Sequence, residues 1–137
     1  MSSSFKRLAF KSCLSFAFAF AIIAVVMGLG ASAKVKIISG AYQSLTLATF
    51  GTAGDYELHV TGRNLNTNHS ATMTTKLRRG TSYGSSTVLR THSKSCSYGQ
   101  TSDIIEDTDA YLHYWGSSTQ IYSGYSETKY GSLPNPY

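Results

Sequence analysis

The sequence predicts an all-β protein, a small jelly-roll-like β-sandwich that follows an N-terminal export signal. Three observations predict it. Thr and Tyr are abundant after residue 33, and all 10 tyrosines lie there; both residue types favour pleated, half-buried strands. Short segments alternate apolar and polar residues and are separated by turns rich in Gly and Ser. No later stretch repeats its apolar residues with the helical period. An open barrel is the alternative arrangement of the same strands.

Residues 1–33 have the three parts of a secretory signal peptide. Three cations within the first eleven residues precede an apolar run over residues 14–27, and Ala31-Ser32-Ala33 offers small residues to a signal peptidase. We therefore expect cleavage after Ala33 and one exported domain over residues 34–137. The alternative is a retained anchor, because a run of about 17 apolar residues is near the lower limit for crossing a bilayer. No later segment is long and apolar enough to do so.

Eight segments read as strands, in the order 34–39, 43–50, 56–61, 71–79, 87–95, 110–115, 119–122 and 125–130. Tyr56–Thr61 alternates most clearly, and 87–95 is the expected hairpin partner of 71–79. Four carboxylates fall within Asp103–Asp109. We expect an exposed acidic connection there rather than a calcium site, because the spacing of a calcium-binding loop is missing. The tail from Leu133 is expected to be frayed.

Charge and cysteine content narrow the function of the exported part. Nine Lys and Arg residues stand against seven Asp and Glu residues after Ala33, a net charge of +2. Such a small excess does not by itself predict nucleic-acid binding. Cys13 would leave with the signal, so Cys96 would have no intrachain partner. We expect a buried, inert thiol, with a bridge between chains as the alternative.

Five cations are expected to gather on the hairpin of segments 71–79 and 87–95. They are Lys76, Arg78, Arg79, Arg90 and Lys94. Alternation places the first two on one face of the first strand and the last two on one face of the second, with Arg79 at the turn. Pairing would then form a patch for an anionic polymer such as teichoic acid or for lipid headgroups. The alternative is a solvated face that keeps the sheet soluble.

A second predicted site is a row of aromatic side chains. Tyr111, His113 and Trp115 share one face of the expected strand 110–115, and Tyr122 follows closely. Sugar rings pack on aromatic faces while their hydroxyls find polar partners, so such a row predicts a glycan-binding surface. The alternative is that Trp115 and one face of this strand belong to the core.

An aromatic residue, a glycine and a polar residue recur four times. The four copies are Tyr83-Gly84-Ser85, Tyr98-Gly99-Gln100, Trp115-Gly116-Ser117 and Tyr130-Gly131-Ser132. Their near-constant spacing fits one strand and its turn recurring, which would place aromatics at successive loop tips. Chance is the alternative, because all these residue types are common here.

The sequence contains few motifs that are typical of catalytic sites. Ser126-Glu127-Thr128-Lys129 matches S-x-x-K, but the other motifs of the enzymes that use it are missing. We expect no enzyme activity, no metal and no cofactor. The preferred hypothesis is a secreted, bacterial, non-enzymatic module that binds a cell-envelope or extracellular glycan or polyanion. The alternatives are a secreted bacteriocin- or toxin-like effector and a self-associating matrix or coat component.

Overall fold

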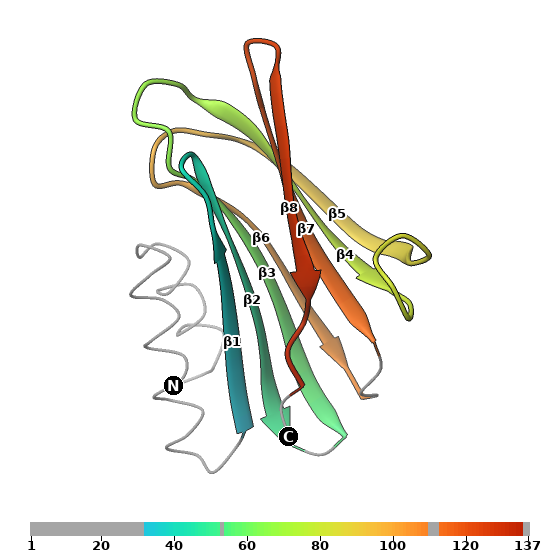
Figure 1. Ribbon diagram of the computed structural model, residues 1–137. Coiled ribbons are helices and arrows are strands. Elements are labelled where there is room, and N and C mark those ends of the chain that lie inside the picture. Colours follow the sequence, from blue (N-terminus) through green and yellow to red (C-terminus); the bar gives the residue numbers. More distant parts are fainter. Residues whose placement is uncertain (1–31, 53, 110–112, 136–137) are drawn as a thin grey trace.

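The structure, a computed structural model, describes residues 32–52, 54–109 and 113–135. Within these residues the chain forms strands and no helix, and so no helix that could cross a membrane. The strands are β1 (Ser32–Ser39), β2 (Gln43–Thr52), β3 (Asp55–Asn64), β4 (Ala71–Arg79), β5 (Thr87–Cys96), β6 (Thr101–Thr108), β7 (Tyr114–Tyr122) and β8 (Tyr125–Ser132). They form two antiparallel sheets, sheet A with the order β1-β2-β3-β6 and sheet B with the order β5-β4-β7-β8 (Figure 1).

The two sheets pack face to face around an apolar core. Its buried members come from both sheets and from the chain after β8: Leu45, Leu47, Leu58, Val60, Leu77, Ile104, Tyr114 and Leu133. Strand β4 shows the alternation that turns side chains inward, since Met73, Thr75 and Leu77 are fully buried while Thr74 and Lys76 between them are partly exposed. The all-β prediction with two facing sheets is confirmed.

The strand order differs from that of a jelly roll. β1, β2 and β3 form a simple antiparallel meander, and β7 and β8 form a hairpin. The chain changes sheets between β3 and β4, and β6 returns to lie beside β3, which is a Greek-key feature. A jelly roll contains two Greek keys, whereas here the first and last strands lie beside their sequence neighbours. The jelly-roll part of the prediction is therefore wrong.

Two local predictions are also wrong. The acidic segment at 103–109 is not a connection, because β6 runs from Thr101 to Thr108 and pairs with β3 along its length. The segment fits a strand because Ser102 and Ile104, two positions apart, are buried on one face, and Glu106 on that same face forms an ion pair with Arg90. The tail does not fray at Leu133, which is buried and whose N–H donates to the Tyr114 carbonyl (2.9 Å). The expected strand 110–115 lies partly outside the described residues, and β7 begins at Tyr114.

Two glycines allow the sheets to approach closely. Gly116 of β7 pairs with Gly131 of β8, and both face sheet A. A Cβ atom on Gly116 would overlap Leu47 Cδ2, and one on Gly131 would lie 2.6 Å from Ile38 Cδ1. The residue before each glycine, Trp115 or Tyr130, therefore lies on the outer face of sheet B, because neighbouring residues of a strand point to opposite faces.

Cys96 is a buried free thiol, as predicted. It is fully buried with Ala71 and Met73, and its Sγ–H donates to the Lys94 carbonyl (3.6 Å). Burial raises the pKa of the Cys96 thiol, partly offset by the nearby Lys94 cation. The reactive thiolate is therefore scarce at neutral pH.

We expect this thiol to react slowly while the protein is folded. In the full chain with Cys13→Ser, a disulfide reagent such as dithiobis(nitrobenzoate) should label Cys96 at least about tenfold more slowly without urea than with it. A reducing agent should leave the melting temperature unchanged. Equal labelling rates in the two conditions would contradict a buried thiol.

Candidate functional site

The predicted five-cation patch is split between the two faces of the β4–β5 hairpin. Arg90 pairs with Leu77 and Lys94 pairs with Met73. Directly paired residues of antiparallel strands share a face, and Leu77 and Met73 are fully buried core residues. Arg90 and Lys94 therefore lie on the side of sheet B that faces sheet A, opposite to Lys76.

The pairing register of β4 and β5 is the physical reason why the five cations are divided between two faces. A shift of one residue in pairing moves every side chain of a strand to the other face, and the pairing observed places Lys76 opposite Thr91. A bulge then lets Arg78 pair with Val88, which leaves Leu89 without a partner in β4. On its own side of the hairpin, Arg90 Nη1 lies 2.6 Å from Glu106 Oε2 of β6. This cation is engaged within the protein.

The predicted aromatic row is not assembled either. Trp115 lies at the start of β7 on the outer face of sheet B, whereas Tyr122 lies at the far end of β7 on the opposite face. His113 precedes β7, is exposed, and accepts a hydrogen bond from the Gly80 N–H at its carbonyl (3.0 Å). Tyr111 lies outside the described residues.

Instead, the structure brings one residue from each predicted site together. Arg78 of β4 pairs with Trp115 of β7 on the outer face of sheet B. Tyr83, from the loop after β4, lies edge-on to Trp115 (ring centroids 6.4 Å apart) and stacks on Tyr130 of β8 (4.1 Å, 16°). The Arg78 guanidinium lies over the Tyr83 ring at 5.0 Å. We call these four residues the outer-face cluster.

Trp115 and Tyr130 have different positions in this cluster. Trp115 is half-buried, and its Nε1–H donates to the Gly80 carbonyl (2.9 Å), so it holds the β4–β5 loop against the sheet. Tyr130 is 53% exposed even though one face of its ring stacks on Tyr83. Tyr130 thus offers the accessible aromatic surface, on a support formed by Tyr83 and Arg78.

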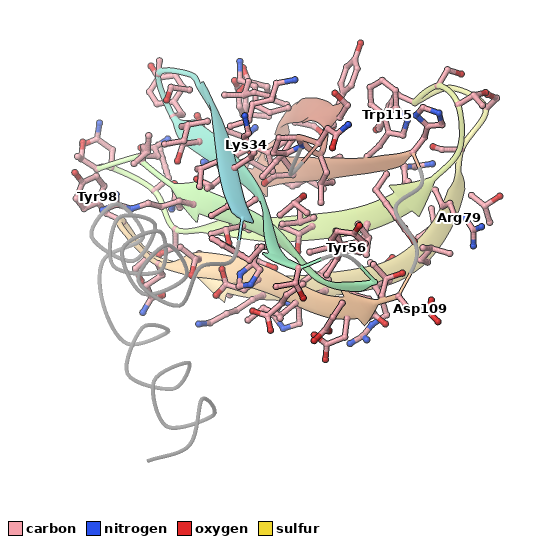
Figure 2. All side chains as sticks on the ribbon, turned by 90° about the horizontal axis from the view of Figure 1, so that it is seen from below. Lys34, Tyr56, Arg79, Tyr98, Asp109 and Trp115 are labelled. Carbon is pink, nitrogen blue, oxygen red and sulfur yellow. The ribbon has the colours of Figure 1, made fainter. Side chains whose placement is uncertain are left out.

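Cations border the cluster. Lys76 and Ser117 are paired, and Ser117 pairs in turn with Tyr130, so Lys76 lies on the same face two strands away from that ring. Among the described residues, no carboxylate forms an ion pair with Lys76 or Arg78. Arg79 is exposed at the end of β4, at the end of the sandwich that also holds Trp115 (Figure 2).

Hydroxyl groups form a row across the outer face of sheet B. Thr74 Oγ1 lies 2.7 Å from Ser93 Oγ, and Thr119 Oγ1 lies 2.8 Å from Thr128 Oγ1. These two cross-strand pairs link all four strands in one row of polar groups. The face therefore combines an exposed aromatic ring, two cations and many hydroxyl donors and acceptors.

Tyr83 and Tyr130 are not among the site residues that the sequence predicts, although one signal in the sequence points to them. Both belong to the recurring aromatic–glycine pattern, and so does Trp115. Three of the four aromatics of that pattern meet in the outer-face cluster. The fourth, Tyr98, lies at the opposite end of the sandwich (Figure 2).

Two pairs of residues that could serve catalysis do not form an accessible site in the described part of the chain. Ser126 and Lys129 lie three positions apart in β8 and so point to opposite faces of sheet B. His92 Nδ1 lies 2.8 Å from Ser102 Oγ, but Ser102 is fully buried and also donates to the His92 carbonyl (2.9 Å), which leaves no access for a substrate. No three His, Cys, Asp or Glu side chains of the described residues are grouped as metal ligands would be.

Comparisons of this chain with protein-family models, with curated proteins and with solved structures found no match.

Proposed function

We propose that this protein is an exported, non-enzymatic module that binds an acidic glycan of the cell envelope or extracellular matrix through the outer-face cluster. The observation that carries the proposal is the stack of Arg78, Tyr83 and Tyr130 beside Trp115 on an open, hydroxyl-rich sheet face. An exposed ring on a rigid support is a surface on which the apolar face of a sugar can pack.

The cations support an acidic sugar rather than a neutral one. Lys76 and Arg78 form no ion pair with the described carboxylates, so their charges are available to a ligand. A planar guanidinium is suited to carboxylate and phosphate groups. Two cations are too few to hold a polyanion by charge alone, so we expect stacking on Tyr130 to contribute a comparable share of the affinity.

Export is part of the same proposal. Cleavage after Ala33 would remove the first two residues of β1, which pair with Gly51 and Phe50, and would leave the six pairs from Lys34 to Ser39. The shortened strand could therefore remain in sheet A. Intact-mass analysis of secreted protein should find a chain that begins at Lys34; full-length, membrane-bound chain alone would contradict this part.

The binding test uses protein expressed from the full chain, with polygalacturonate as the acidic probe and its methyl ester as the uncharged probe. Tyr130→Ala should weaken polygalacturonate binding about tenfold, the upper range for loss of one stacked aromatic. Tyr98→Ala is the matched control, because Tyr98 is equally exposed (56%) at the other end of the molecule. It should bind as the parent does.

Charge should contribute separately. Arg78→Gln should weaken binding and should reduce its salt dependence, because raising salt from 0.1 to 1 M shortens the Debye length from about 10 to 3 Å.

The parent should prefer polygalacturonate to its ester. Binding of the parent and the same variants to alginate and to teichoic acid is measured as well, to find which anionic polymer binds best. If none of the three polymers binds, or if folded Tyr130→Ala binds as the parent does, the proposal is wrong, and the effector hypothesis becomes the preferred one.

A further inference from the structure

The outer face of sheet A carries a cluster of negative charge. Leu47 and Val60 pack toward sheet B, so the residues that alternate with them in β2 and β3 point to the opposite side of sheet A. Four carboxylates lie on that side, namely Asp55 and Glu57 of β3 and Asp103 and Asp107 of β6. Of the Lys and Arg residues in the described strands of sheet A, only Arg63 shares it. We call the outer face of sheet A the acidic face.

Two of these carboxylates are available to a partner. Glu57 and Asp107 pair directly across β3 and β6, and like charges in such positions destabilise a sheet. Glu57 Oε1 lies 2.7 Å from His59 Nε2. In contrast, Asp55 and Asp107 are exposed and form no ion pair with a described cation.

The outer face of sheet B has the opposite charge. Lys76 and Arg78 lie on it, and no carboxylate of the described strands does, because Glu127 of β8 points inward. Lys76 and Arg78 are two positions apart on one strand, a separation of about 7 Å. Asp55 and Asp107 are diagonal neighbours across β3 and β6, which places them about 7–8 Å apart. The two cations therefore match the two carboxylates in spacing.

Each outer face also has an apolar half beside its charged half. On sheet A, the edge strands β1 and β2 place four apolar side chains outward: Val35, Ile37, Ala48 and Phe50. On sheet B, β7 and β8 place Trp115 and Tyr130 outward, together with Ile121, which is 46% exposed. The apolar half lies along β1 and β2 in one sheet and along β7 and β8 in the other.

The halves of the two faces are aligned across the sandwich. Within the molecule β1 lies next to β8, β3 next to β4 and β6 next to β5, so the carboxylates are behind the cations of β4. The strand ends agree as well, because the Thr108 hydroxyl, next to Asp107, lies 3.2 Å from the hydroxyl of Tyr114, next to Trp115. A second copy moved along the sheet normal without rotation would therefore place carboxylates over cations and apolar side chains over aromatic ones.

The acidic face also contains side chains that call for a covering surface. In the full-length chain Ala48, Phe50 and His59 are buried on it, although sheet B packs against the other side of sheet A. Phe50 meets His59 edge to face, with 4.8 Å between the ring centroids. A second molecule can supply such a cover to the exported chain.

We propose that exported copies of this protein stack in a line, with the acidic face of one copy on the outer face of sheet B of the next. The cations of β4 pair with Asp55 and Asp107 of the next copy, and the apolar half of the acidic face covers Trp115 and Tyr130. The contact joins two different surfaces and repeats without rotation, so it forms an open chain of copies rather than a closed dimer.

Stacking rests on the proposed export, because the acidic face must be open in a chain that begins at Lys34, but it does not rest on glycan binding. Both activities use the outer face of sheet B. A glycan bound at the outer-face cluster should therefore shorten the stacks, and the last copy of each stack should keep its cluster open.

Sedimentation velocity without any polysaccharide measures stacking of protein expressed from the full chain. At about 0.05 M salt the weight-average mass of the parent should rise with concentration past the mass of a dimer. At about 1 M salt it should fall toward the monomer mass, because the Debye length is then about 3 Å.

Two double variants each disable one face. Asp55→Lys with Asp107→Lys reverses the available charge of the acidic face, and Lys76→Gln with Arg78→Gln neutralises the face of sheet B. Each variant alone should self-associate with a Kd at least about fivefold above that of the parent, as the loss of two exposed ion pairs gives. An equimolar mixture retains one intact contact, so it should form dimers and nothing larger.

Lys94→Gln is the control for loss of a cation, because Lys94 is exposed but lies on the inner side of β5. It should stack as the parent does. The variant with Asp55→Lys and Asp107→Lys should still bind polygalacturonate at least as tightly as the parent, because its outer-face cluster is unchanged. This result separates a failure of stacking from a failure of glycan binding.

Four outcomes overturn the stacking proposal: a parent chain that begins at Lys34 and stays monomeric at about 1 mM, a double variant that stacks as the parent does, a mixture that grows beyond dimers, or a Lys94→Gln protein that is weakened as much as the double variants. A sample that intact-mass analysis finds to be full-length overturns export and stacking together.

Discussion

Replacing Asn64 by Ala should lower the free energy of unfolding by about 3–5 kcal/mol. Four hydrogen bonds end on this fully buried side chain, from or to Asn66, His69, Cys96 and Gln120. Each buried group left without a partner costs about 1–3 kcal/mol, and the Gln120 amide keeps its bond to the Tyr42 carbonyl, which limits the total. The melting temperature should fall by roughly 15 °C or more.

Urea and thermal unfolding followed by circular dichroism measure this effect. Asn68→Ala is the matched control, because Asn68 is exposed in the same loop and only its backbone N–H takes part, donating to Asn66 Oδ1 (2.9 Å). It should change stability by less than about 0.5 kcal/mol, as surface substitutions usually do. A loss below about 1 kcal/mol for Asn64→Ala would mean that water replaces the amide in these four hydrogen bonds.

The second large effect is expected at Gly116. A Cβ atom there would overlap Leu47 Cδ2 and would lie 3.0 Å from both γ-methyl groups of Val60. Leu47 and Val60 are fully buried, so neither can move without disturbing the core. Gly116→Ala should destabilise the protein by about 2–3 kcal/mol, the upper range for overpacking by one methyl group.

Two further variants make this test specific. Gly84→Ala should be neutral or slightly stabilising, because a Cβ there meets no atom within 4 Å. Adding Leu47→Val to Gly116→Ala should recover part of the loss, because it removes the overlapping methyl. An additive double mutant would show that the two positions are not in steric conflict.

The sequence was sufficient to predict most strands, because alternation is a local signal. The segments 71–79 and 87–95 were predicted within one residue and as a hairpin, and β4 and β5 confirm both expectations. Strand β6 was missed because its carboxylates dominated the interpretation of Asp103–Asp109. The β-branched residues at its centre, Ile104 and Ile105, were the better guide.

The candidate site was less predictable, because it depends on register and on long-range pairing. Whether Arg90 joins Lys76 or faces the other sheet is decided by one residue of offset, and the long β4–β5 loop and the bulge at Leu89 set that offset. The meeting of Trp115 with Tyr83 and Tyr130 combines three segments. Their shared aromatic–glycine pattern was the only trace of it in the sequence.

The inward turn of the β5 cations also bears on how this protein avoids aggregation. β5 is an edge strand whose residues from Thr87 to Ser95 are all exposed, so its free edge could accept a strand from a neighbouring molecule. Such an addition would place a neighbouring strand beside Arg90 and Lys94 and would remove water from both charges. Inward-pointing charges and a bulge are the features by which natural sheets resist growing into fibrils. A chain this rich in Thr and Tyr can therefore keep a long open edge that is protected against the addition of further strands.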